Sequence, residues 1–481
     1  MENCLLGLEP SVLWRHFYDL TQISHGSRNE LELANHIWAM ANEKKLDPYM
    51  DLKNNVFVRL PASAGYEDLP SVCLQSHLDM VVAKHEDVNF VFPIRCYIED
   101  GCLFAKETTL GADNGIGVAA MMSLIETEIP HGPLELLFTT EEEVGMVGIT
   151  GFDFTLIKSK FIVNLDSEVE NHLFVGSAGY IYSSIKFQKK QTVVIAKEGD
   201  VIMDILLCGM MGGHSGLDIH KGCTNAIIAM AAIMQALNNL PINLVNLKGG
   251  DKVNQIPNEA KVSILLPGIL VDEVTALLKN NTAKIAEMYF DDIVLHQDIS
   301  SVDMDASVSI IENAQELFLL LLSLPNGVLG MEPLRADLVR TSCNLGVIKA
   351  DYEAFCVEAL LRSSSMGDME VYQSRINALA GHFGASVKVV NQSISWQPKF
   401  DTQLLKTCRA VALNVFGVEP EIVSIHAGLE CAAFDVALPS AQKISFGPLI
   451  KGAHTIRECV DLQSVERFWQ FLTKLLLAVK Y

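Results

Sequence analysis

Short apolar runs that read as β-strands alternate with helix-like stretches in the first part of the chain. The strand-like runs cover residues 55–60, 71–74, 134–138 and 160–165, and small and apolar residues recur at helical spacing over 114–126. This alternation favours a mainly parallel sheet with helices on both faces. Functional side chains in such sheets gather at the carboxyl ends of the strands. The polar residues that follow the runs are therefore the candidates for a site.

Five motifs carry these polar residues. They are SHLDMV with His77 and Asp79, GADNGIG with Asp113, TTEEEVGM with Glu142 and Glu143, NLDSE with Asp166, and the late GAHT with His454. Side chains of a strand repeat with a period of two, so His77 and Asp79 are expected to point to one face. The acid would accept a proton from one ring nitrogen of the histidine and leave the other nitrogen free for a metal ion.

The charges of these motifs indicate a metal centre. Gathered without cations, the five carboxylates would repel one another and their pKa values would rise. The motifs around them contain no Arg or Lys, whereas two divalent ions would balance three ligating carboxylates and a bridging hydroxide. Mixed histidine and carboxylate ligation suits Zn²⁺, with Mn²⁺ or Co²⁺ as alternatives. Taken alone, the glutamate run also fits a solvated acidic turn, and Asp113 also fits a helix cap.

The middle of the chain has a different order of predicted strands and helices. Strands at 200–207, 260–266 and 293–297 alternate with helices at 224–240 and 271–289. A similar order of elements recurs later, with a strand at 354–361, a helix at 369–383 and a strand at 385–390. This β-α-β-β-α-β pattern predicts one or two ferredoxin-like sandwiches.

The C-terminal part must return to the first domain if His454 joins His77 in one site. It reads as a helix at 403–416 and strands at 421–425 and 443–446. The predicted domains are therefore a catalytic domain made of residues 1–186 and 394–481, and an inserted domain of residues 187–393. The fold class is α/β, with an α+β insertion.

Composition excludes several classes of partner. The formal net charge of -22 argues against nucleic acid and anionic membrane surfaces, which need clustered Lys and Arg. The opening MENCLLGLEP is not expected to be a secretory signal, and the apolar run 317–324 is too short to span a bilayer and suits a buried helix. The eleven cysteines show no CxxC spacing, which favours reduced thiols and a cytoplasmic protein.

The five motifs, in this order, resemble the co-catalytic zinc metallopeptidases that include glutamate carboxypeptidase, aminoacylase and the carnosine-type dipeptidases. Three further stretches are similar to the bacterial aminoacyl-histidine dipeptidases of that family. They are GMMGGHSGLDIHKG at Gly209–Gly222, NQIPNEA at Asn254–Ala260 and SIHAGLEC at Ser424–Cys431. The resemblance implies a two-domain metallopeptidase whose inserted domain serves as a lid and in dimerisation.

The resemblance also implies the metal ligands. His77 and Asp166 would bind one ion, Glu143 and His454 the other, and Asp113 would bridge the two. The implied cofactor is two Zn²⁺ per subunit.

Roles in catalysis and substrate binding follow from the same resemblance. Glu142 would be the base that activates a metal-bridging water, Asp79 would support the site, and His214 would reach from the inserted domain to stabilise the oxyanion. Three residues would bind substrate: Arg362, which would hold the free α-carboxylate, Asn254 and Gly428.

The leading hypothesis is a cytoplasmic, homodimeric dipeptidase that hydrolyses unblocked dipeptides, preferentially Xaa-His. A deacylase of N-acyl amino acids on the same scaffold is the alternative, because it would bind a free carboxylate in the same way. A metal-binding scaffold without catalysis is a third hypothesis, against which the retained Glu142 speaks. The chain departs from the family's pattern in TIRE after His454 and in AAF after HAGLEC, and both could shift substrate preference.

Overall fold

Two compact units make up the protein. The computed structural model describes residues 4–89, 91–289 and 291–480. Unit 1 comprises Met1–Ser177, Trp396–Ile425 and Leu429–Tyr481, and unit 2 comprises Ala178–Ser395 and His426–Gly428. The C-terminal part thus belongs to the same unit as the N-terminal part. The domain division at 186 and 393, and the lid role given to the insertion, stay predictions.

An eight-stranded sheet forms the centre of unit 1. Its spatial order is β1 (Tyr49–Met50), β2 (Val56–Leu60), β6 (Leu134–Thr139), β3 (Val72–His77), β7 (Phe161–Asn164), β23 (Gln442–Ser445), β8 (His172–Ser177) and β22 (Glu421–Ile425). The central strands β6, β3, β7 and β23 run parallel to one another, as the sequence predicts. Every residue of β3, β6 and β7 is buried, which is typical of parallel strands covered on both faces. The carboxyl ends of these strands therefore share one edge of the sheet.

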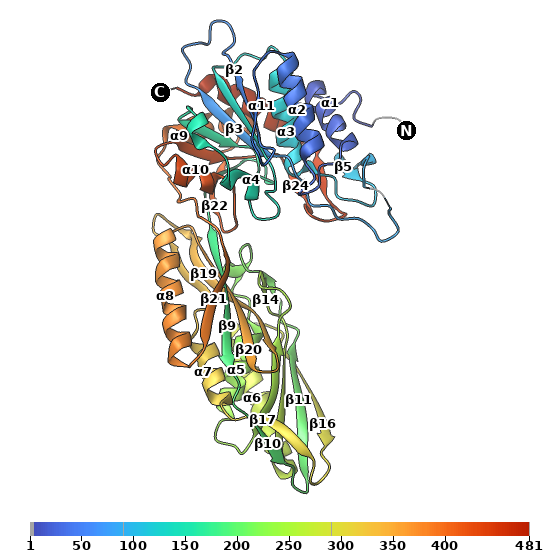
Figure 1. The fold of residues 1–481 in the computed structure, drawn as a ribbon, viewed down its shortest axis with the longest axis vertical. Helices are drawn as coiled ribbons and strands as arrows, with labels where there is room; N and C mark the ends of the chain where they lie inside the picture. Colours follow the sequence, from blue (N-terminus) through green and yellow to red (C-terminus); the bar gives the residue numbers. More distant parts are fainter. Residues whose placement is uncertain (1–3, 90, 290, 481) are drawn as a thin grey trace. The chain divides into compact units, whose positions relative to one another are not determined.

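Helices cover both faces of this sheet. They are α1 (Ser11–Gln22), α2 (Leu31–Glu43), α3 (Ala112–Glu126), α4 (Val147–Thr150), α9 (Gln403–Phe416), α10 (Cys431–Ala437) and α11 (Leu462–Ala478). In Figure 1, α1, α2 and α3 lie on one side of β2 and β3. Leu74 and Leu136 join the apolar core that includes residues of α1, α2, α3, α9 and α11. Phe57 faces the other way and packs against Phe152 with ring centroids 5.9 Å apart.

A small antiparallel sheet supports the GAHT loop. Its order is β24 (Ile450–Lys451), β25 (Cys459–Asp461), β5 (Cys102–Ala105) and β4 (Cys96–Glu99). His454 lies between β24 and β25, in a left-handed backbone conformation with φ of 64°. The hairpin pairs with β5, a few residues before the loop that carries Asp113. This pairing brings the late histidine motif to the first motifs of the chain.

Unit 2 is built on an eleven-stranded sheet. The main order is β16 (Val294–Ser301), β11 (Asp200–Cys208), β15 (Ala260–Pro267), β13 (Asn243–Gly249), β19 (Arg335–Ala350), β20 (Ala354–Ser363), β9 (Gly179–Gln188) and β21 (Ser386–Gln392). Three more strands join it: β10 (Gln191–Ile195), β17 (Ser307–Ile311) and β18 (Gly327–Glu332). The short strands β12 (Gly213–His214) and β14 (Gln255–Ile256) form a separate pair.

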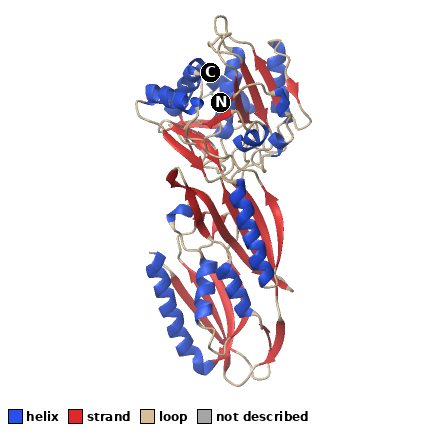
Figure 2. Ribbon diagram, turned by 90° about the vertical axis from the view of Figure 1, so that its left-hand side faces the viewer, coloured by secondary structure: helices blue, strands red, loops and turns tan. Residues whose placement is uncertain are grey.

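Two ferredoxin-like sandwiches account for this sheet, and one is nested within the other. The inner one runs β11, α5 (Ala226–Ala236), β13, β15, α6 (Val271–Tyr289), β16. The outer one runs β9, α7 (Ala314–Ser323), β19, β20, α8 (Met366–His382), β21. Figure 2 shows helices alongside the strands of this unit, and buried residues of all four helices share one apolar core with the sheet. The predicted β-α-β-β-α-β plan is confirmed.

The structure also corrects several predicted elements. The strand predicted over 71–74 continues to His77, and Asp79 lies beyond its end. The helix predicted over 224–240 begins at Ala226, because the side chain of Asn225 accepts the backbone N–H groups of Ile227 and Ile228 and caps it there, and it ends at Ala236. The apolar run 317–324 lies mostly in α7, where Leu317, Phe318, Leu320 and Leu321 are buried as predicted, whereas Leu319 and Leu322 are exposed. Within the described part of the chain, no helix has the length and apolar character needed to cross a bilayer.

Candidate metal centre

Three neighbouring parallel strands deliver four of the predicted residues to one edge of the sheet. His77 is the last residue of β3, Asp166 follows β7, and Glu142 and Glu143 follow β6. His77 is buried at 1% exposure, so its ring lies within the protein. The arrangement is the one expected at the carboxyl edge of a parallel sheet.

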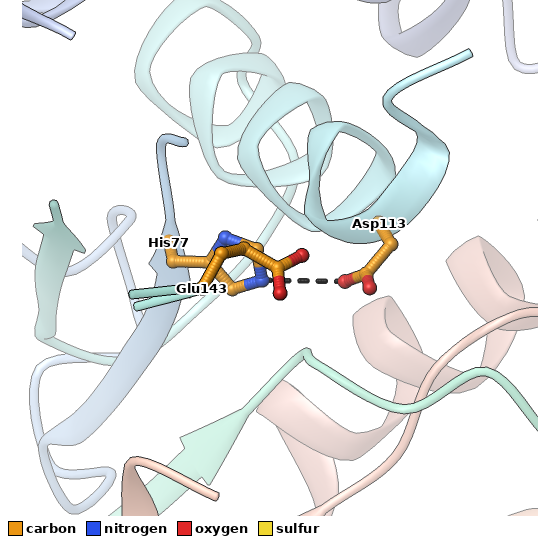
Figure 3. A group of neighbouring side chains, drawn as sticks. All are labelled: His77, Asp113 and Glu143. Carbon is orange, nitrogen blue, oxygen red and sulfur yellow. Dashed lines mark hydrogen bonds and ion pairs between the residues drawn. The ribbon is translucent and has the colours of Figure 1, made fainter. Parts of the chain in front are cut away.

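Asp113 lies at the centre of the cluster. Its Oδ1 is 3.2 Å from His77 Nε2, and its Oδ2 is 3.2 Å from His454 Nε2. His77 Nε2 is also 3.2 Å from Asp166 Oδ1, and His454 Nε2 is 2.8 Å from Glu143 Oε1. Figure 3 shows His77, Glu143 and Asp113 turned toward one another, with Asp113 at the start of its helix. The two oxygens of Asp113 therefore serve two different histidine–carboxylate pairs.

The local chain holds Asp113 out of the regular helix. α3 begins after Gly111, which adopts a left-handed φ of 72°. Asp113 itself has φ of -84° and ψ of 110°, which is not helical. Its carboxylate points to the two histidines and does not cap the helix, so the capping role that the motif alone also allows is wrong.

The electrostatics of the cluster are those of a site for cations. Burial lowers the pKa of His77, but Asp166 and hydrogen bonds to Asp113 and Asp166 outweigh it and raise that pKa well above its usual value. Hydrogen bonds with Asp113 and Glu143 raise the pKa of His454 to about 11. Burial opposes ionisation of Asp113, yet hydrogen bonds from both histidines hold its pKa well below the usual range. The two imidazoles and the carboxylates thus favour each other's charged forms.

The donor set fits divalent metal ions. One ligand atom each from His77, Asp113 and Glu143 lies within 4.8 Å of the other two. Glu143 Oε1 is buried, and its partner is His454 Nε2 at 2.8 Å. Two imidazoles and three carboxylates, divided by Asp113 into two groups, are suitable ligands for two ions. The residues that the resemblance assigns as ligands thus lie together.

Asp79 supports the cluster through the backbone. Its Oδ1 accepts the N–H of Glu142 at 2.9 Å, and its Oδ2 accepts the N–H of Glu143 at 3.2 Å and the hydroxyl of Ser27 at 2.9 Å. The predicted bond between this carboxylate and His77 is wrong in detail. His77 Nδ1 bonds the backbone carbonyl of Asp79 at 2.8 Å, while the carboxylate oxygen is 3.6 Å away, because the strand ends before Asp79.

Glu142 lies next to Glu143 and is surrounded by acids. Desolvation, together with the charges of Asp166, Glu430 and Glu143, raises its pKa well above the usual value. A carboxyl group with a raised pKa is suited to accept a proton and pass it on.

Two buried glutamates contribute to the site although the sequence-based assignment omits them. Glu458 accepts the backbone N–H groups of Leu110, Gly111, Ala112 and Asp113 at 2.8–3.2 Å. Its only sequence signal is an acid shortly after His454, in the TIRE departure. Glu430 is fully buried, and its Oε2 accepts hydrogen bonds from Gln75 and from Thr139 Oγ1. Burial raises the pKa of Glu430 to about 8.

The remaining predicted residues form a second group, within unit 2. His214 Nδ1 accepts the backbone N–H groups of Gly216 and Leu217 at 3.2 and 3.0 Å, so its proton lies on Nε2. Burial, followed by the charge of Arg362, lowers the pKa of His214 and keeps it neutral. Asn254 is exposed, and its backbone carbonyl accepts the N–H of Ser215.

Arg362 is a buried cation with an unused donor. Its side chain is 8% exposed, and its Nε lacks a hydrogen-bond partner among the described residues. Burial lowers its pKa to about 10, so the guanidinium keeps its charge at neutral pH. Gly428 lies in the segment His426–Gly428 of the same unit. His426, which the sequence-based assignment omits, bonds Ser342 Oγ through Nε2 at 2.7 Å. The metal-centre residues and these residues belong to different units.

The chain is similar to several known peptidases. The model of peptidase family M20/M25/M40 matches residues 73–478. The cytosol non-specific dipeptidase of Escherichia coli (strain K12) is 34% identical over 481 residues, which cover 98% of each chain. The crystal structure of aminoacylhistidine dipeptidase from Vibrio alginolyticus is 34% identical, with a TM-score of 0.91 over 99% of this chain and 98% of that one. A tripeptidase from Staphylococcus aureus, 15% identical with a TM-score of 0.55 over 98% and 99% of the two chains, shares the fold.

Proposed function

Because the chain belongs to peptidase family M20/M25/M40, we propose that the cluster around Asp113 is the dinuclear metal centre of a dipeptidase that cleaves unblocked dipeptides, with preference for Xaa-His. The protein is a peptide hydrolase of that family. The observation that carries the proposal is the division of the two Asp113 oxygens between His77 and His454. The preference for Xaa-His rests on the sequence resemblance and on the name of the Vibrio relative.

The proposed ligands are His77 and Asp166 for one ion, Glu143 and His454 for the other, and Asp113 for both. We propose Zn²⁺, with Mn²⁺ and Co²⁺ as alternatives, because the set mixes imidazole nitrogen with carboxylate oxygen. When bound, the ions would polarise the scissile carbonyl and make water acidic at neutral pH.

Glu142 is the proposed general base and acid. It would take the proton of the attacking water and give it to the leaving amine, a contribution of about 10²–10⁴-fold in rate. Asp79 fixes the backbone of Glu142 and Glu143 and thereby sets where their carboxylates lie.

Two residues of unit 2 are assigned to the substrate. The neutral ring of His214, with its proton on Nε2, is the proposed donor to the developing oxyanion. The charged Arg362, whose buried Nε still offers a hydrogen bond, is the proposed partner of the free α-carboxylate. Asn254 and Gly428 are proposed to contact substrate from the same unit.

A cytoplasmic location and a homodimer formed through residues 187–393 complete the proposal. The location is supported by the eleven cysteines without CxxC spacing and by the name of the Escherichia coli relative. Light scattering of the purified protein tests the dimer.

The function is tested with Glu142→Gln. Hydrolysis of Gly-His and β-Ala-His by the metal-loaded wild type should exceed that of the variant by about 10²–10⁴-fold, because the amide cannot accept the water's proton. Metal analysis should give about two ions in both proteins. Glu141→Gln is the matched control, since it changes the neighbouring acid, and it should keep activity within a few fold.

Each alternative has its own outcome. Two bound ions with cleavage of N-acetylated amino acids, and none of free dipeptides, would replace the dipeptidase by the deacylase. Full activity of Glu142→Gln would overturn the role of that residue, and failure of the wild type to bind metal under replete conditions would overturn the proposal.

A further inference from the structure

A hollow of about 550 Å³ in unit 1 is bordered by the proposed ligand Glu143. Its apolar walls come from Met80, Val81, Val82, Val91, Phe92 and Val144. Among its described lining residues, Glu143 is the only ionisable one. An apolar space of this size beside reactive groups is typical of a binding pocket.

Two polar side chains of the wall donate hydrogen bonds to other residues of the protein. Ser27 donates its hydroxyl to Asp79 at 2.9 Å, and Asn29 donates its amide to Ser24 Oγ at 2.8 Å. A ligand in the hollow would therefore meet mainly apolar surface.

The wall is also held in place. Gly26 forms a parallel bridge with Met80, and the N–H of Ser27 bonds the carbonyl of Met80 at 3.3 Å. A Cβ on Gly26 would lie 2.6 Å from a methyl group of Val82, so Val82 packs directly on this glycine. The hollow is thus formed by the same segment that carries the support of Glu142 and Glu143.

We propose that this hollow binds the side chain of the amino-terminal residue of the dipeptide and makes the enzyme prefer apolar residues there. The inference rests on the proposed function. The carbonyl that is cleaved belongs to the amino-terminal residue, and its side chain branches from the next carbon. The pocket for that side chain must therefore adjoin the ligands that hold the ions, and Glu143 belongs to both.

The chemistry of the walls sets the order of preference. Leucine or methionine would exchange water for apolar contacts. An aspartate would lose its hydration without gaining a partner and would face the carboxylates of the centre. Glycine would leave the hollow empty and gain nothing from it.

The test compares kcat/KM of the metal-loaded enzyme on Leu-His, Met-His, Gly-His and Asp-His. The kcat/KM for Leu-His and for Met-His should exceed that for Gly-His by at least about tenfold, and the kcat/KM for Asp-His should be the lowest. Calorimetric titration of Glu142→Gln with Leu-His and Gly-His gives a readout without turnover and should show tighter binding of Leu-His.

Two variants place a charge in the wall: Val82→Asp and Val144→Asp, at side chains that are 46% and 39% exposed. Each variant should lower the ratio of kcat/KM for Leu-His to kcat/KM for Gly-His by about tenfold or more. Val418→Asp, at an exposed valine elsewhere in unit 1, is the matched control and should leave the ratio unchanged.

The outcomes separate this inference from the proposed function. Cleavage of all four dipeptides without an apolar preference, or a preference that survives both variants, overturns the inference and leaves the dipeptidase intact. Failure to cleave any dipeptide overturns both.

Discussion

Asp113 gives one carboxylate oxygen to each of two histidines, and this division explains why the site has two halves. His77 and His454 come from opposite ends of the sequence, and each is accompanied by a second carboxylate, Asp166 or Glu143. A single substitution at Asp113 would therefore weaken both halves. Residues that serve two partners at once tolerate little change.

His426 should make the stability of unit 2 depend on pH. Burial, and then the charges of Arg362 and His214, lower its pKa to about 3. The unfolded chain takes up a proton below about pH 6.5, whereas the folded chain does not until much lower pH. The stability that this group contributes is thus present above pH 6.5 and falls as the pH drops toward 3, by up to about 1.4 kcal/mol per pH unit.

Urea unfolding at pH 7 and pH 5 measures this effect. The side chain of His426→Gln can still bond Ser342. Between pH 7 and pH 5, the free energy of unfolding of this variant should fall by about 1–2 kcal/mol less than that of the wild type. His85→Gln changes an exposed histidine and should behave like the wild type. Equal pH dependence of wild type and His426→Gln would contradict the prediction.

The beginning of α3 depends on a residue more than three hundred positions away. The carboxylate of Glu458 accepts four consecutive backbone N–H groups there, and two of them, from Ala112 and Asp113, belong to the first turn, whose N–H groups have no partner within the helix. Glu458 is a positioning residue, because its carboxylate holds the backbone of Leu110–Asp113 and thereby fixes where Asp113 lies.

Glu458→Gln should destabilise the protein by about 1–3 kcal/mol, because an amide NH₂ would face buried N–H donors. It should also weaken metal affinity about 10–100-fold, as expected when the support of a ligand is lost. Urea unfolding and competition with a metal indicator measure the two effects. Glu466→Gln, an exposed acid of α11, should change stability by less than about 0.5 kcal/mol. Unchanged metal affinity in Glu458→Gln would contradict the positioning role.

Elements with a clear period could be predicted from the sequence. The bounds of α6, α9 and β22 agree with the predicted ranges, because amphipathic or apolar runs end there at evident turns. The strands β8, β9 and β19 escaped prediction. The extent of these strands depends on pairing with strands that are distant in the sequence. The local pattern of apolar residues does not indicate that pairing.

The same limit applies to the site. The histidines and carboxylates of the cluster could be predicted, because each occurs in a short motif at the end of a strand or in a loop that contains glycine. Glu430 and Glu458 could not, since their roles arise from buried hydrogen bonds to backbone or to Gln75 and Thr139, which form only in the folded chain.

The whole molecule should be more stable with metal than without it. Binding to the folded state alone stabilises by about 2.7 kcal/mol at a ligand concentration one hundred times the Kd. Calorimetry should therefore show a lower Tm after chelation and its recovery when Zn²⁺ is restored. Asp113→Asn, which removes the shared ligand, should have a Tm that depends much less on metal. A wild-type Tm that is insensitive to chelation would contradict the prediction.

Unit 1 is assembled from separated stretches of chain, and this has a consequence during translation. β23 lies between β7 and β8 in the sheet, yet it follows β7 by on the order of 300 residues. At about 5–20 residues per second, a ribosome needs roughly 15–60 s to make that interval. Unit 2 is nearly continuous and can fold while the chain is still being made. The cluster around Asp113 has to wait for His454, so a nascent chain on the ribosome carries only one of its two histidines until synthesis is almost finished.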